Sequence, residues 1–139
     1  RPFGGKCWVL HNSIRLIEHT ELSRAISKIT IESEDMGKIS IFGIWQPFDD
    51  GSHEKLALLH STISILESEI EYAEFPIMLM GDFNSDFYNI NKRFDSIFLK
   101  FLNKIFLKLD RSHCFFLDIS SSVNILVSIT LLLFFNLYF

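Results

Sequence analysis

A short apolar run bounded by two structure-breaking residues is the feature that most constrains the fold. Residues 77–80 read Ile-Met-Leu-Met, with Pro76 before them and Gly81 after them. A run of this length and composition is typical of a fully buried strand and is too short for a helix. Gly81 is expected to let the backbone turn where the strand ends. The chain is therefore expected to contain a central strand at 77–80.

Polar residues follow this strand directly. In an extended segment, residues i and i+2 point the same way, so Asp82 and Asn84 are expected to share one face while Phe83 turns toward the core. Ligands of open α/β sheets bind at the carboxyl ends of strands, which makes this a candidate site. The alternative is a purely structural Asx turn or cap, in which both side chains bond nearby backbone.

The residues before this strand show the period of a helix. Apolar residues recur at spacings of three and four along 53–72, while glutamates fall mainly off that stripe. The stripe consists of Leu56, Leu59, Ile63, Leu66 and Ile70. A helix that leads into a buried strand predicts a strand–helix–strand crossover and a parallel strand pair.

The first strand of that crossover belongs to a predicted hairpin. Residues 24–32 and 39–46 are rich in β-branched and aromatic side chains, and the segment between them contains Gly37. Ile26 and Ile29 are an odd number of residues apart, so their side chains point to opposite faces of an extended strand. Either the register shifts or both faces of the strand are partly covered.

Three further elements complete the predicted α/β fold. We expect a strand at Lys6–His11, an extended piece at 14–19, and a second helix at Lys92–Lys108. Lysines at 100, 104 and 108 form a ridge along that helix. The ridge is interpreted either as a track for a phosphate backbone or as an ordinary solvated face.

The sequence around Asp82 resembles a known family. Met80-Gly81-Asp82-Phe83-Asn84 resembles the Gly-Asp-x-Asn motif of the endonuclease/exonuclease/phosphatase superfamily, the group that includes the deoxyribonuclease I-like nucleases. The opening Arg1-Pro2-Phe3-Gly4-Gly5 and the run from Trp45 to Asp50 resemble most the endonuclease domain of LINE-type retrotransposons. The resemblance covers residues 1–109 and implies part of an α/β sandwich, a mixed sheet with covering helices that is incomplete at both ends.

The resemblance also implies a chemistry, namely hydrolysis of a DNA phosphodiester with Mg²⁺, or Mn²⁺, and an activated water. By the family pattern, Asp82 orients or deprotonates the water and is a tentative metal ligand, and Asn84 hydrogen-bonds a phosphate oxygen. Trp45 occupies the position of a tyrosine that helps to hold the phosphate. An indole can donate a hydrogen bond but cannot accept one, so Trp45 is either a substrate-binding residue or simply a large core residue.

The sequence departs from the family pattern in the rest of the catalytic set. It contains no Ser-Asp-His triplet; Ser112-His113 lacks the aspartate, which makes His113 a poor substitute. The family's upstream asparagine and glutamate would precede Arg1. We therefore expect a retroelement-derived fragment that is inactive alone.

The carboxyl-terminal residues 110–139 are expected to form a separate hydrophobic tail. Residues 123–139 carry no charge and are just long enough for a marginal membrane span. The tail is interpreted as a membrane-associated segment, as a buried strand, or as translated sequence never selected as protein. We expect an intracellular protein, nuclear or cytoplasmic, with membrane attachment through the tail as the alternative.

Charge and cysteine content limit the function only weakly, and the resemblance leaves two alternatives to the DNA endonuclease. The net charge of −4 does not exclude a nucleic-acid enzyme but requires a local basic face. Cys7 and Cys114 lie far apart and fit reduced thiols rather than a disulfide framework. The alternatives are a phosphatase of the same superfamily and a non-enzymatic truncated product.

Overall fold

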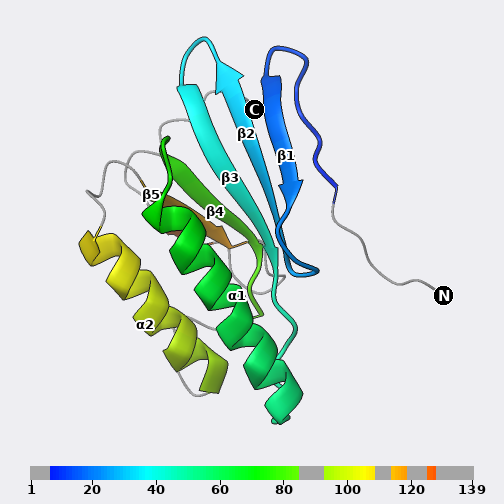
Figure 1. Cartoon of the computed structure of the whole chain (residues 1–139), viewed down its shortest axis with the longest axis vertical. Helices are drawn as coiled ribbons and strands as arrows, with labels where there is room; N and C mark the ends of the chain where they lie inside the picture. Colours follow the sequence, from blue (N-terminus) through cyan, green and yellow to red (C-terminus); the bar gives the residue numbers. More distant parts are fainter. Residues whose placement is uncertain (1–6, 85–92, 109–113, 119–124, 128–139) are drawn as a thin grey trace, which may run out of the picture.

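The fold is a mixed β-sheet covered on one face by two helices, as the computed structural model shows (Figure 1). The structure describes residues 7–84, 93–108, 114–118 and 125–127. The strands are β1 (Arg15–Glu21), β2 (Ile26–Ser33), β3 (Gly37–Trp45), β4 (Ile77–Asp82), β5 (Cys114–Asp118) and β6 (Ile125–Val127). The helices are α1 (His53–Glu71) and α2 (Arg93–Lys108). The predicted α/β class is confirmed.

The strands lie in the sheet in their order along the chain. Strand β2 is antiparallel to both β1 and β3, β4 is parallel to both β3 and β5, and β6 is antiparallel to β5. The predicted hairpin, the crossover helix and the central strand are confirmed as β2–β3, α1 and β4. Strands β5 and β6 extend this same sheet beyond residue 109.

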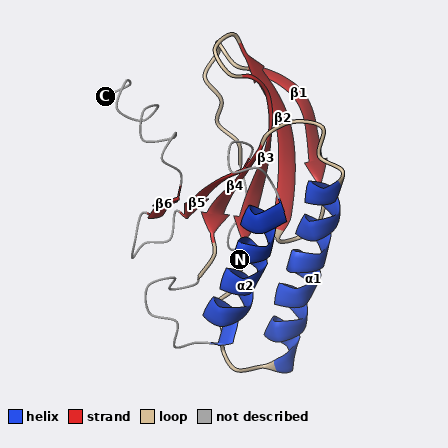
Figure 2. Cartoon of the chain, turned by 90° about the vertical axis from the view of Figure 1, so that its left-hand side faces the viewer, coloured by secondary structure: helices blue, strands red, loops and turns tan. Residues whose placement is uncertain are grey.

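The face of the sheet that packs against the helices holds the main core (Figure 2). Ile26 and Phe42 from the hairpin pack there with Leu79 from β4, and the inner sides of α1 and α2 cover them. Helix α1 begins at the N-cap Ser52, whose hydroxyl accepts a hydrogen bond from the backbone N–H of Lys55 at 3.2 Å. This bond satisfies one of the free donors of the first turn, so the predicted start of the helix is confirmed.

The opposite face of the sheet is also apolar. Four isoleucines of the hairpin are buried on it with help from Trp8, Leu10 and the two methionines of β4. Ile26 belongs to the core beneath the helices and Ile29 to this second cluster. Strands β2 and β3 pair without a register shift from Ile26 to Ser33. Both faces of β2 are therefore covered, which is one of the two alternatives that the sequence left open.

The predicted strand at Lys6–His11 is wrong over the residues that the structure describes there. Residues 7–11 have no strand, and Trp8 instead lies against the sheet, where its indole N–H donates to Ser27 Oγ at 2.6 Å. Gly43 makes room for the ring, since a Cβ at that position would lie 2.7 Å from Trp8 Cζ2. The segment thus covers the sheet with its side chains and adds no backbone pairing.

Candidate functional site

Asp82 is the last residue of β4, at the end of the sheet where the parallel strands β3 and β4 both finish. Its Cα partner across the pair is Trp45, the last residue of β3. Strand alternation places Asp82 on the same side as Met78 and Met80, which belong to the second apolar cluster. The candidate site therefore lies on the sheet face opposite the helices, and Asp82 is half-buried there.

Gly81 has a different role from the turn that the sequence suggested. The strand continues through it to Asp82, and Gly81 adopts φ +142°. A Cβ at this position would overlap the carbonyl oxygen of Ile44 and would lie 2.8 Å from the Ile44 nitrogen. Glycine is needed because β4 passes this close to β3, and the close approach brings Asp82 beside Trp45.

Asn84 departs from the expected alternation. Its φ is +46°, the left-handed region, which asparagine tolerates better than most residues. Its side-chain Nδ2 donates a hydrogen bond to the backbone carbonyl of Gln46 at 2.6 Å. Asp82 Oδ1 accepts a hydrogen bond from the backbone N–H of Asn84 at 3.1 Å. The Asx turn that the sequence offered as a structural alternative is thus present, and Phe83 between the two residues is fully buried as predicted.

Among the contacts of the described residues, each of the two polar side chains keeps one group without a hydrogen-bond partner. Asp82 Oδ1 is engaged by Asn84, and no other described contact occupies Oδ2. Asn84 Nδ2 carries two hydrogens, and the bond to Gln46 uses one of them. The turn therefore fixes both side chains and leaves an acceptor and a donor at the end of β4.

Gln46 is a residue that the sequence reasoning did not select. Its backbone N–H donates to the carbonyl of Asp82 at 2.8 Å, and its own carbonyl accepts from Asn84. Its side chain is fully buried, and neither amide atom has a hydrogen-bond partner in the part of the chain that the structure describes. Only its place next to Trp45 in the sequence hinted at a role, because the pairing with Asn84 joins residues 38 apart.

The loop after β3 exposes two aromatic side chains. Trp45 is 43% exposed and Phe48 is 63% exposed, although Gln46 and Pro47 between them are buried. The interpretation of Trp45 as a core residue is therefore wrong. The alternation of β3 places the side chain of Trp45 on the face opposite the helices. Trp45 is also the last residue of that strand.

An ion pair ties this loop to α2. Arg93 Nη2 donates to Asp49 Oδ1 at 2.7 Å and to the Ser52 carbonyl at 3.1 Å. The guanidinium of Arg93 and the backbone N–H of Gly51 hold the pKa of Asp49 below its usual range, against the opposing effect of burial. The loop is thus fastened at both its β3 end and its α1 end.

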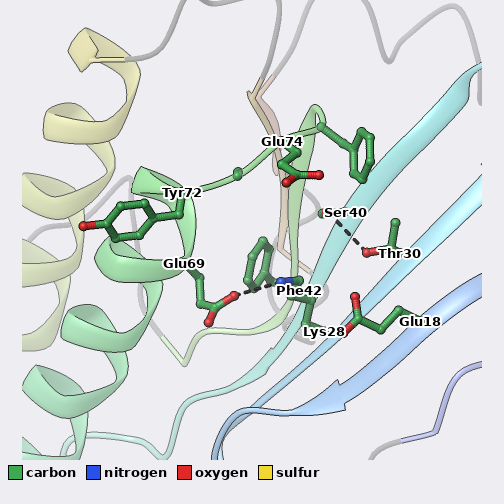
Figure 3. A pocket seen from close by; sticks show the side chains of 10 residues that line it. Glu18, Lys28, Thr30, Ser40, Phe42, Glu69, Tyr72 and Glu74 are labelled. Carbon is green, nitrogen blue, oxygen red and sulfur yellow. Dashed lines mark hydrogen bonds and ion pairs between the residues drawn. The ribbon is translucent and has the colours of Figure 1, made fainter.

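A cavity of about 260 Å³ lies at the other end of β4, away from Asp82 (Figure 3). It opens between the last turn of α1 and the sheet, and Lys28 crosses it to reach Glu69 at 2.9 Å. Its lining also includes two other carboxylates, two hydroxyls and two aromatic rings: Glu18, Glu74, Thr30, Ser40, Phe42 and Tyr72. No residue predicted for the site lies in it.

The described residues do not form a complete metal site. Within 7–84, 93–108 and the two short strands that follow, no group of three or more His, Cys, Asp or Glu side chains is placed to hold an ion. Asp82 contributes one free carboxylate oxygen. Mg²⁺ keeps several waters and is often held by one or two carboxylates together with substrate phosphates, so Asp82 fits as one ligand among several.

Other predicted features lie wholly or partly outside the described residues. These are the loop at 85–91 with Asp86, the pair Ser112-His113, and most of the tail at 123–139, of which the structure describes the strand β6. Among the described helices, none is long and apolar enough to cross a membrane. On the described part of α2, Lys104 pairs with Glu67 at 2.7 Å and Lys100 is exposed, which fits a solvated face.

Comparisons with known proteins add no assignment, since no protein-family model, curated protein or solved structure matches the chain.

Proposed function

We propose that Asp82 and Asn84 form part of a site for metal-dependent hydrolysis of phosphodiesters, with DNA as the substrate. The observation that carries the proposal is the fixed turn at the end of β4, which leaves one carboxylate oxygen and one amide N–H free. The resemblance of residues 80–84 to the endonuclease/exonuclease/phosphatase motif supports the same assignment.

The two free groups suit complementary tasks. The free oxygen of Asp82 accepts a hydrogen bond or a proton from an attacking water, which is the work of a general base. The free N–H of Asn84 donates to a non-bridging phosphate oxygen, whose negative charge grows in the transition state. Both side chains are held before substrate arrives, so little reorganisation accompanies binding.

A bound Mg²⁺ would polarise the phosphoryl oxygens and stabilise the leaving group. Asp82 is the described residue that would help to hold it. The remaining ligands would come from water and from the phosphate itself, which matches the preference of this ion for few protein ligands. The sandwich architecture of the superfamily belongs to the same proposal, and the apolar second face of the sheet supports it.

Paramagnetic NMR tests this assignment without requiring turnover. Mn²⁺ is added to the ¹⁵N-labelled chain in the presence of a thymidine dinucleotide, and amide broadening is mapped along the backbone. Broadening is expected to centre on Asp82 to Asn84 and on Gln46, and Asp82→Asn should remove it. Asp35→Asn, in the exposed turn between β2 and β3, is the matched control and should leave the broadening unchanged.

Two results would overturn the assignment. One is broadening centred on the cavity at the opposite end of β4, where Glu18, Glu69 and Glu74 gather (Figure 3). The other is broadening near Asp82 that persists in Asp82→Asn.

A further inference from the structure

Two exposed aromatic residues lie at the end of β3 and in the loop that follows it. Trp45 pairs with Asp82 across the parallel strands, and Phe48 follows three residues later in the same loop. Three residues span at most about 10 Å of chain, so the Cα of Phe48 lies within that distance of the Cα of Trp45, the residue that pairs with Asp82. Contiguous exposed apolar surface that is rimmed by polar residues marks interaction sites or ligand-binding grooves.

The backbone that carries these rings is firmly held. The N–H of Trp45 donates to the Ala25 carbonyl at 2.9 Å. Beyond Phe48, Asp49 is bound by Arg93 at 2.7 Å, and its Oδ1 also accepts from the N–H of Gly51 at 3.0 Å. Aromatic residues on a fixed backbone lose little conformational entropy on binding. Most of the favourable free energy of stacking therefore contributes to the affinity.

The region around the two aromatic residues carries charges of both signs, and its carboxylates include the exposed Asp50 and the strand-end Asp82. Arg93 is already committed to Asp49, whereas Arg24 is exposed and no interaction within the described structure engages its side chain. Arg24 precedes Ala25, the residue that binds the backbone of Trp45. Arg24 is thus an uncommitted cation whose backbone lies close to that of Trp45, and it can contact a phosphate, but a long basic track is missing from this part of the described surface.

We propose that Trp45, Phe48 and Arg24 bind a short unpaired stretch of nucleic acid, with bases stacked on the two rings and a phosphate against Arg24. The proposal rests on the proposed function, since it places the scissile phosphodiester at Asp82 and Asn84. Stacking requires a free base face, which an unpaired nucleotide offers and an intact duplex hides. Substrates with distorted, frayed or single-stranded segments are therefore preferred over continuous duplex.

Binding of fluorescein-labelled decathymidylate to the full chain, followed by fluorescence anisotropy in a chelating buffer, tests the proposal. Trp45→Ala and Phe48→Ala should each raise Kd about five-fold to a hundred-fold, because base stacking on one ring contributes about 1–3 kcal/mol. Trp45→Phe should retain most of the affinity. The control is Tyr72→Ala, which removes an even more exposed ring, 79% exposed, at the opposite end of the sheet, and it should leave Kd unchanged.

Two further comparisons sharpen the test. The same sequence annealed into a duplex should bind more weakly than the single strand. The slope of log Kd against log salt concentration should fall by about one in Arg24→Ala, as expected for the loss of a single phosphate contact.

The proposal is overturned if the chain does not bind the single strand, if duplex binds as well as single strand, or if the ring-to-alanine variants match Tyr72→Ala. These outcomes are separate from failure of the proposed function. Chelator-resistant single-strand binding that depends on Trp45, found together with no Mn²⁺ effect at Asp82, would keep this surface and remove the hydrolytic site.

Discussion

The side-chain amide of Asn84 donates a 2.6 Å hydrogen bond to the backbone carbonyl of Gln46, which joins the ends of two neighbouring parallel strands. The backbone N–H of Gln46 in turn donates to the carbonyl of Asp82 at 2.8 Å. The candidate site is therefore built on a clamp between the segments that follow β3 and β4, and the two segments are expected to move together.

Replacement of Asn84 by aspartate should weaken this clamp. The substitution places a carboxylate against the Gln46 carbonyl. Both groups are hydrogen-bond acceptors, so the hydrogen bond that Asn84 Nδ2 donates to Gln46 is lost. We expect the free energy of unfolding in urea to fall by about 1–3 kcal/mol, the cost of leaving a partly buried polar group unpaired. Asn12→Asp, in an exposed turn, is the control and should change it by less than about 0.5 kcal/mol. Equal effects of the two substitutions would show that the clamp adds no stability.

Replacement of Gly81 by alanine should be costly for a different reason. The new Cβ would overlap the Ile44 carbonyl, and φ +142° is strained for any side chain. We expect a loss of about 2–4 kcal/mol, from overpacking and backbone strain together. Gly51→Ala separates these two causes, because Gly51 also has positive φ, +83°, but open space around it. It should lose only about 1 kcal/mol, and a loss as large as that of Gly81→Ala would contradict the role given to the close approach.

Stability should depend on pH through Asp49. The Arg93 guanidinium lowers the pKa of Asp49 in the folded state, so the unfolded chain binds the proton at higher pH than the folded chain does. The ion pair therefore stabilises the fold above the unfolded pKa of about 3.9. This contribution is lost as the pH falls through the folded pKa.

The measurement is urea unfolding of wild type and Asp49→Asn from neutral to acidic pH. The wild type should be more stable near neutrality, and the two curves should converge on acidification. The free energy of unfolding of Asp35→Asn should change with pH in the same way as that of the wild type. A difference between wild type and Asp49→Asn that does not change with pH would show that the ion pair is not its source.

The sequence predicted the elements whose signal is local. The helical stripe of α1 and the apolar run of β4 each show their period within a few residues, and the structure has both within a residue or two of the expected bounds. The segment at 7–11 shows the limit of this reasoning. Its alternation indicates that Trp8 and Leu10 face one side, and both do pack on the sheet. Whether the backbone also pairs depends on a partner strand, which the local sequence does not encode.

The structure corrects the geometry expected for the candidate site, while the assignment of Asp82 and Asn84 to it stays a prediction. Extended backbone was expected through residue 84, and the positive φ of Asn84 ends it earlier. Gln46 and Arg24 come close to the ends of β3 and β4 through contacts between distant segments, Gln46 with Asn84 and Ala25 with Trp45. The spacing of residues along the chain does not predict such contacts.

Plasmid nicking with Mg²⁺ tests the central claim most directly. The chain is assayed alone and fused to the upstream and downstream segments of an endonuclease of the superfamily, which supply the glutamate strand and the Ser-Asp-His motif. The chain alone should show little cleavage, because loss of even one preorganised transition-state donor costs about 10²–10³ in rate. The fusion should nick the plasmid, a chelator should stop it, Asp82→Ala should abolish it, and Asp35→Ala should not. Nicking by the fusion that survives Asp82→Ala would contradict the site, and chelator-sensitive nicking by the chain alone would contradict the expectation that it is inactive alone.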